Sequence, residues 1–195
     1  MPLVDDGLKK ELSQLYGAPE RHYHGLAHIE VLLALAKHHR ADLADPEAVE
    51  AAIWFHDAVY DSTRKDNEEK SAELATERLS GRVVAERLRR IAGMIEATAT
   101  HRIPDFADET ARRDAALFLD MDLSILGAPP AEFDAYEEAV RQEYGWVDEP
   151  TWRAGRAAVL KGFLQRPFIF HSEIFRQGRE KQARENIARS LARLG

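Results

Sequence analysis

The chain has 195 residues, of which 45% are hydrophobic and 31% are charged, and its formal net charge is -7. A chain of this length can bury a sizeable core, most simply as a single domain over residues 1–195. The acidic balance gives it no general attraction for a nucleic-acid polymer or for an anionic membrane surface. A small phosphorylated substrate stays compatible with this charge, because a bound cation reverses the local field.

The chain contains no cysteine, which excludes disulfides, thiolate metal sites and cysteine nucleophiles and fits a cytoplasmic location. The first residues, Met1 to Asp6, lack the basic region and the apolar run of a signal peptide. No apolar stretch approaches the roughly 20 residues that span a bilayer. We therefore expect no membrane partner, and no exposed stripe of the sequence demands an oligomer.

Helix-forming residues dominate the chain, and the alternation typical of β-strands is scarce. The spacing of apolar residues predicts helices at about 3–16, 25–40, 46–58, 67–80, 82–100, 107–121, 130–144, 150–165 and 173–193. Asp45 before Pro46 predicts a helix start, since aspartate caps helices and proline suits the first helical position. Gly81 and the segment 127–130 separate helical runs. The sequence therefore predicts an all-α fold, a single helical bundle with short connections.

Three of these helices carry a histidine or an aspartate at the end of an apolar stripe. The spacing i, i+3, i+4, i+7 recurs in His28, Val31, Leu32 and Leu35, in Val49, Ala52, Ile53 and His56, and in Ala115, Phe118, Leu119 and Asp122. Each stripe predicts that its polar member faces inward. Asp57 follows His56 directly. The three helices are thus expected to bring imidazoles and carboxylates into the interior.

Imidazole and carboxylate groups need partners when they are buried, because burial alone costs a few kcal/mol for a neutral group and far more for a charge. Two imidazoles and two carboxylates form a mixed nitrogen and oxygen set that suits a divalent transition metal. A lone histidine on an apolar face is more often a structural core residue, and a His–Asp pair can be an ion pair at a helix end. The repetition of the pattern in three helices favours a metal site.

The same residues resemble a known family. The segments Tyr23 to His28, Trp54 to Asp61 (WFHDAVYD) and Leu119 to Leu123 (LDMDL) resemble the H…HD…D pattern of the HD-domain superfamily. More narrowly, the stretches 56–72 and 120–127 resemble a bacterial group described as predicted metal-dependent HD phosphohydrolases. The resemblance covers roughly residues 20–190. It implies one metal ion held by four ligands: His28, His56, Asp57 and Asp122, with Asp120 as the alternative to Asp122.

The resemblance implies a single divalent ion, which could be Mn, Co, Ni, Zn, Fe or Mg. HD proteins with two metals usually insert two further histidines between the HD pair and the last aspartate. Only His101 lies between Asp57 and Asp122 here, which argues against a two-metal site. His101 is a candidate to contact phosphate or water near the metal, with a solvent-facing residue at a helix end as the alternative.

Further candidates surround the HD pair. In related HD hydrolases an acidic residue just beyond this pair acts on the attacking water or the leaving group, so the resemblance makes Asp61 the candidate general acid or base. The alternative is a loop residue that bonds to nearby backbone. Arg64 and Lys65 are candidates for binding substrate phosphate, with a solvated charge pair as the alternative. His24 is a candidate to line the substrate side, and Arg21 is a further phosphate candidate.

The resulting expectation is a metal-dependent phosphohydrolase that acts on a small phosphomonoester or phosphoanhydride, with nucleotides among the candidate substrates. In this scheme the metal activates water and polarises a phosphate oxygen, and Asp61 manages the proton. One alternative is a metal- and nucleotide-binding module with little or no turnover. Another is a helical scaffold with buried His–Asp ion pairs and no metal.

Overall fold

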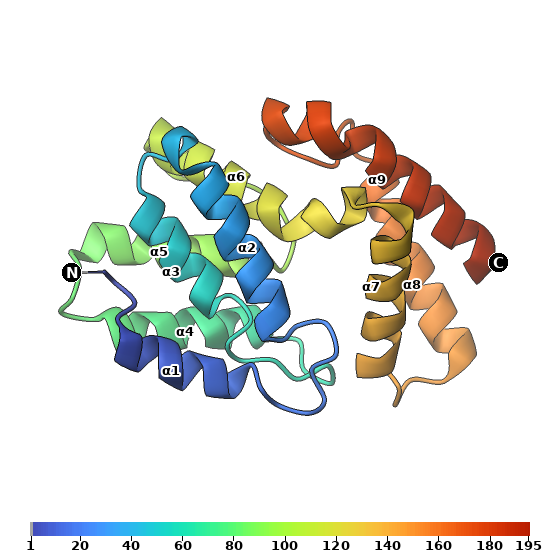
Figure 1. Cartoon of the computed structure of the whole chain (residues 1–195), viewed down its shortest axis with the longest axis horizontal. Helices are drawn as coiled ribbons and strands as arrows, with labels where there is room; N and C mark the ends of the chain where they lie inside the picture. Colours follow the sequence, from blue (N-terminus) through green and yellow to red (C-terminus); the bar gives the residue numbers. More distant parts are fainter. Residues whose placement is uncertain (1) are drawn as a thin grey trace. The chain divides into compact units, whose positions relative to one another are not determined.

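The structure is a computed structural model that describes residues 2–195. Met1, which belongs to the segment without signal-peptide features, lies outside the described residues. These residues form α-helices and two short 3-10 helices, with no β-strand among them (Figure 1), which confirms the predicted all-α class. Within residues 2–195, no helix is both long enough and apolar enough for a membrane span. The chain divides into two compact units, one running to Met121 and the other covering Asp122–Gly195. A single domain over residues 1–195 stays a prediction.

The first unit is built around one buried helix. It contains α1 (Asp6–Leu15), α2 (Leu26–His38), the 3-10 helix η1 (Arg40–Asp42), α3 (Pro46–Phe55), α4 (Asn67–Leu79), α5 (Ala85–Ala97) and α6 (Glu109–Asp122). Helix α3 packs against α1, α2, α4 and α5 and lies in the middle of this unit in Figure 1. Its residues from Ala48 to Phe55 are buried except Glu50. The core of this unit therefore surrounds α3 on several sides.

The ends of α3 and α4 follow from local chemistry. Asp45 accepts a hydrogen bond from the backbone N–H of Ala48 at 3.1 Å, and Pro46 occupies the first turn, as predicted. Gly81 adopts a φ of 75° in the turn between α4 and α5. Glycine reaches this left-handed conformation without a steric penalty, which explains why the helical run is broken there.

The apolar face of α2 differs from the expected one. Val31 is 54% exposed, so the predicted stripe that included it was wrong at this position. The buried face consists of His28, Ile29, Leu32 and Ala36. Helix α2 is apolar over most of its surface, and a periodicity argument cannot fix which side of such a helix faces inward. His28 belongs to both versions of the face, so its burial was predicted correctly.

The second unit is held by polar contacts to its last helix. It contains the 3-10 helix η2 (Leu123–Gly127), α7 (Pro130–Glu143), α8 (Glu149–Leu164) and α9 (Glu173–Leu194). The buried Asn186 of α9 donates to the carbonyls of Leu126 at 2.9 Å and Ala128 at 2.8 Å. Asn186 therefore satisfies two backbone acceptors of the η2 segment that would otherwise lack partners.

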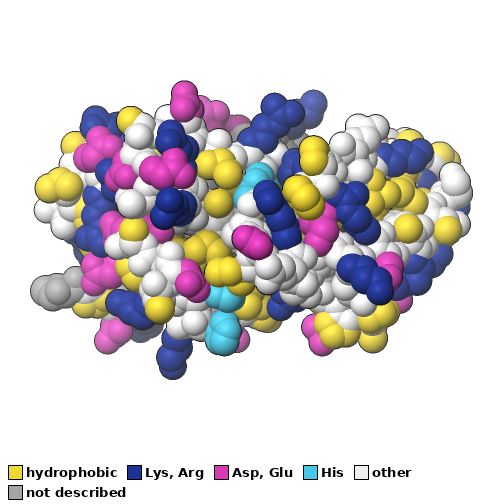
Figure 2. Space-filling model, turned by 90° about the horizontal axis from the view of Figure 1, so that it is seen from above, with side chains coloured by type: hydrophobic (Ala, Val, Ile, Leu, Met, Phe, Trp, Pro, Cys, Tyr) yellow, Lys and Arg dark blue, Asp and Glu magenta, His cyan; other side chains and the backbone are white. Residues whose placement is uncertain are grey.

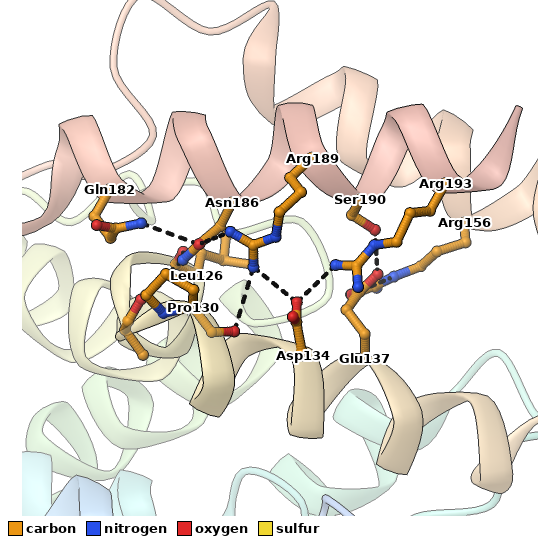
Figure 3. Close-up of polar contacts among 11 residues, drawn as sticks. Leu126, Pro130, Asp134, Glu137, Arg156, Gln182, Asn186, Arg189, Ser190 and Arg193 are labelled. Atoms are coloured by element: carbon orange, nitrogen blue, oxygen red, sulfur yellow. Dashed lines mark hydrogen bonds and ion pairs between the residues drawn. The ribbon is translucent and has the colours of Figure 1, made fainter.

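Ion pairs join α7 to α9 in the same unit. Figure 3 shows Arg189 and Arg193 of α9 reaching Asp134 of α7, with nitrogen–oxygen distances of 2.7 and 2.6 Å. The adjacent Glu137 accepts from Ser190 at 2.6 Å and pairs with Arg156 of α8. The arginines of α9 thus carry structural contacts within the second unit.

Charges of both signs share the molecular surface. On the face shown in Figure 2, Lys and Arg side chains are interspersed with Asp and Glu side chains. The two units nevertheless differ in composition. Residues 1–121 contain 23 acidic and 16 basic residues, whereas residues 122–195 contain 11 of each. The whole excess of negative charge therefore belongs to the first unit.

Candidate metal centre

Helix ends place three of the candidate ligands. His28 lies in the first turn of α2, His56 caps the C-terminus of α3, and Asp122 is the last residue of α6. Each offers one ligand atom, and these atoms all lie within 4.8 Å of one another. The boundary between the two units falls at this last residue of α6, so Asp122 is positioned by a helix whose other residues belong to the first unit. This group could hold a metal ion.

The two imidazoles meet at the same ring nitrogen. The Nε2 atoms of His28 and His56 are 3.3 Å apart, and the two residues are 7% and 1% exposed. Two nitrogens bonded to one ion at about 2.0–2.1 Å, with angles between octahedral and tetrahedral, are about 2.8–3.4 Å apart. The separation of the two rings therefore fits two ligands of a single ion.

The orientation of His56 is fixed through its other ring nitrogen. Nδ1 lies 2.9 Å from the carbonyl oxygen of Ile53. Because a carbonyl only accepts hydrogen bonds, Nδ1 carries a proton and donates it to Ile53, and Nε2 faces His28 and Asp57. Metal-binding histidines commonly show this arrangement, in which a backbone carbonyl fixes the tautomer. The ring of Phe118, 5.9 Å away between centroids, contacts His56 edge-on.

Asp57 lies beside both imidazoles. Its Oδ2 atom is 3.0 Å from Nε2 of His56 and 3.9 Å from Nε2 of His28. Burial disfavours the charged carboxylate, but His56, together with His24 and His28, outweighs this effect and holds the pKa of Asp57 well below its usual range. Asp57 is therefore an anion at neutral pH, the form in which a carboxylate binds a metal. We call His28, His56, Asp57 and Asp122 the His–Asp cluster.

The structure distinguishes between the two aspartates at the end of α6. His28, His56 and Asp122 form the group that could hold an ion, and within the described residues neither Asp120 nor Asp57 is a member of it. Side chains two positions apart on an α-helix point in directions about 200° apart around the helix axis, so the two carboxylates leave the helix on nearly opposite sides. Asp120 is fully buried within α6. The geometry thus brings Asp122, which the sequence favoured, close to the two histidines, and the identity of the fourth ligand stays a prediction.

Asp61 lies in an exposed loop after the HD pair. Its carboxylate accepts from the backbone N–H of Thr63 at 2.9 Å and from the Thr63 hydroxyl at 2.7 Å. These bonds hold the pKa of Asp61 below its ordinary value. Asn67 closes the same loop, accepting from the N–H of Asp61 and donating to its carbonyl. The loop bonding that was the alternative for Asp61 is present, and its role as general acid or base stays a prediction.

Arg64 and Lys65 follow Asp61 in the same loop, and both are exposed. Arg64 forms a two-pronged ion pair with Asp66, with nitrogen–oxygen distances of 2.9 and 2.6 Å. Hydrogen bonding to Asp66 raises the pKa of Arg64. The guanidinium fork that could hold two phosphate oxygens is therefore turned toward a neighbouring carboxylate, and phosphate binding by either residue stays a prediction.

His24 and His101 lie at helix boundaries. The half-buried His24 stacks on Tyr60 with ring centroids 4.4 Å apart, and its ring lies 6.4 Å from that of His28. His24 is therefore close to the His–Asp cluster. His101 follows α5 with a φ of 49°, the left-handed conformation that ends many helices. The predicted contact of His101 with phosphate or water stays a prediction.

Arg21, whose charge made it a candidate for binding phosphate, contacts backbone carbonyls. Its guanidinium donates to the backbone carbonyls of His24, Asp57 and Ala58. The guanidinium of Arg21 thus makes a structural contact with these three carbonyls, and phosphate binding by Arg21 stays a prediction. Backbone carbonyls at a helix end need hydrogen-bond donors. The position of Arg21 shortly before the helix that carries His28 was the feature of the sequence that could have indicated this contact.

Comparison with protein-family models, with curated proteins and with solved structures found no match for this chain. The all-α fold and the buried His–His–Asp group therefore rest on the geometry described above. Assignment to the HD-domain superfamily belongs to the proposal that follows.

Proposed function

We propose that this chain is an HD-type phosphohydrolase that binds one divalent transition metal ion through the His–Asp cluster. The proposed substrate is a small phosphomonoester or phosphoanhydride, with nucleotides among the candidates. The observation that carries the proposal is the 3.3 Å approach of two buried Nε2 atoms beside the Asp57 carboxylate. The order of the ligands along the chain, which resembles the H…HD…D pattern, also supports it.

The donor set fits the proposed ion. Two imidazole nitrogens and two carboxylates match the preference of Mn, Co, Ni, Zn and Fe for mixed nitrogen and oxygen ligands. Such an ion, when bound, supplies Lewis acidity at a phosphate oxygen and a nucleophile derived from water at neutral pH. Ile53 holds the His56 tautomer through its carbonyl. Asp61 is the proposed proton carrier, and a cytoplasmic location is proposed because the chain has no cysteine.

The proposal is tested first by metal analysis of protein purified without chelator and then incubated with Mn, Co, Ni or Zn. We expect about one ion per chain, lost in the His56→Ala and Asp57→Ala variants. His39→Ala is the matched control, because His39 pairs with Asp42 outside the cluster at 3.3 Å. Metal-loaded protein is then assayed for phosphate release from a panel of phosphate esters and anhydrides. Protein that binds no ion, or that binds one and hydrolyses no substrate of the panel, would contradict the proposal.

A second candidate function is a module that binds metal and nucleotide with little or no turnover. The engagement of Asp61 with Thr63 favours it, because a carboxylate already held in its loop is poorly prepared for proton transfer. This candidate predicts stoichiometric nucleotide binding without phosphate release, unchanged in Asp61→Asn. The hydrolase predicts phosphate release that falls strongly in the same variant.

A further inference from the structure

The C-terminal end of α3 leaves backbone carbonyls without helical partners, as every α-helix does. Three carbonyls at this end of the helix accept from nearby residues of the same segment. Ala52 accepts from the N–H of His56 and Phe55 accepts from the N–H of Ala58, both at 2.9 Å. Ile53 accepts from the ring of His56 at 2.9 Å. This end of the helix therefore helps to orient a residue of the His–Asp cluster.

The carbonyl of Trp54 at this helix end and two carbonyls just beyond it accept from residues that precede α2 in the chain. The hydroxyl of Tyr16 donates to Trp54 at 3.0 Å. Nη1 of Arg21 donates to the carbonyl of Asp57 at 2.6 Å, and Nη2 donates to that of Ala58 at 3.0 Å. A positive charge at a helix C-terminus also interacts favourably with the helix dipole. We call residues 56–58 the HD turn, and its backbone is thus held from outside α3.

Arg21 holds a second segment at the same time. Its Nη1 atom also donates to the carbonyl of His24, at 3.0 Å, just before α2 begins. The guanidinium lies 5.0 Å from the ring centroid of Tyr16 and 5.4 Å from that of Tyr60. These aromatic contacts stabilise the cation and restrict its orientation. One side chain therefore connects the start of the helix that carries His28 to the turn that carries His56 and Asp57.

We propose that Arg21 is a positioning residue of the metal centre, which fixes the start of α2 and the HD turn so that their ligand atoms meet. The proposal rests on the proposed function, since it concerns the same ion. Removal of Arg21 releases the backbone of Asp57 and Ala58 together with that of His24. Lysine cannot replace it, because an ammonium group lacks the planar fork that serves three carbonyls between two aromatic rings.

The experiment measures Co(II) binding to the full chain and the visible absorption spectrum of the bound Co(II), which reports the ligand geometry. Arg21→Met and Arg21→Lys are compared with the unmutated protein. We expect about 10–100-fold weaker binding, the usual effect of losing a group that orients metal ligands, and an altered spectrum. Arg21→Lys keeps the charge and much of the side chain, so it tests the proposal even if Arg21→Met does not fold.

Arg184→Met is the matched control. Arg184 also donates to three backbone carbonyls, those of Leu164, Arg166 and Pro167, and all of them belong to the second unit. We expect this variant to keep the affinity and the spectrum. Arg21 variants that fold and bind Co(II) with unchanged affinity and spectrum overturn the positioning role alone, as does an equal loss in Arg184→Met. Unmutated protein that binds no Co(II) overturns the proposed function as well.

Discussion

His56 uses its two ring nitrogens for different purposes. Nδ1 donates to the carbonyl of Ile53, one turn earlier in the same chain segment, and Nε2 points toward His28 and Asp57. The first contact lies within the C-terminal end of α3, which ends at Phe55. The second requires α2 to lie alongside α3. The contact that orients the side chain is therefore separate from the contacts that bring the candidate ligands together.

Asp122 and Asp120 provide a test of the ligand set. We expect Asp122→Asn to weaken Co(II) binding by about tenfold or more, because an amide is a poorer ligand than a carboxylate. Asp120→Asn should keep the metal affinity of the folded protein, although it changes a fully buried side chain. Titration with Co(II) of each folded variant measures the difference. The opposite ranking would exchange the roles of the two residues.

The sequence predicted the types and positions of the cluster residues better than their surroundings. His28, His56 and Asp122 could be predicted because helical periodicity places each at the end of an apolar stripe. Arg21 could not be placed, because its acceptors lie in a turn 36 and 37 positions away and no periodicity encodes such a contact. Its charge alone suggested phosphate binding.

Asp45 links stability to pH. Burial raises the pKa of Asp45, but the Arg87 ion pair and the N–H of Ala48 outweigh it and keep the value below its ordinary one. A carboxyl with a lowered folded pKa stabilises the protein above its unfolded pKa of about 3.9, and this contribution is lost as pH falls through the folded value. Asparagine caps helices as well as aspartate. Asp45→Asn therefore keeps the helix cap but removes the charge and one of the two oxygens that accept from Arg87.

We expect Asp45→Asn to lower the free energy of unfolding by about 1 kcal/mol near neutral pH, a typical value for an ion pair of this exposure. The difference should shrink in acid as Asp45 of the unmutated protein becomes protonated. Urea denaturation followed by circular dichroism at several pH values measures it. Asp105→Asn, at an exposed loop position, is the control and should show little effect. A difference that stays constant from neutral to acid pH would contradict the assignment.

At the level of helices, the boundaries were predicted where a local signal exists. The start of α3 was predicted within one residue, because Asp45 and Pro46 mark it. The end of α3 was placed at residue 58, three residues too late, because His56 and Asp57 continue the apolar pattern without a stop signal. The side of α2 that faces inward was predicted only in part, since Val31 and Ile29 are equally apolar. Packing against neighbouring helices, rather than composition, decides that Ile29 faces inward and Val31 outward.

Gly127 marks a close approach of η2 to α9. A Cβ atom at this position would lie 2.6 Å from Cβ of Arg179 and 2.7 Å from its carbonyl oxygen. Since backbone atoms cannot move aside cheaply, Gly127→Ala should lower the free energy of unfolding by about 1–3 kcal/mol. Circular dichroism during urea denaturation measures the change.

Gly155 of α8 is the matched control for this substitution. It is exposed, and a Cβ atom there would meet nothing within 4 Å. Gly155→Ala should therefore raise the free energy of unfolding by about 0.5–1 kcal/mol, the difference in helix propensity. If Gly127→Ala were equally stabilising, η2 and α9 would not approach as closely as described.

For the whole molecule, metal binding and stability are coupled. The cluster residues come from three helices spread over residues 26–122, and the unit that carries most of them holds the excess of acidic residues. An ion that binds only the folded chain raises its stability by about 2.7 kcal/mol at a free concentration 100-fold above the dissociation constant. We therefore expect Co(II) to raise the melting temperature of chelator-treated protein. His39→Ala should behave in the same way, and a rise of the same size in His56→Ala would place the ion elsewhere.

The tryptophans give each unit its own optical probe. Trp54, in α3 of the first unit, is 7% exposed, whereas Trp146 of the second unit is 61% exposed, and Trp152 follows it in α8. Fluorescence of a Trp146→Phe/Trp152→Phe variant therefore reports on the surroundings of α3, and that of Trp54→Phe reports on the α7–α8 region. If residues 1–195 form a single domain, as predicted, both signals change at the same urea concentration. Separate transitions would assign the chain two independently folding halves, with Asp122 at their junction.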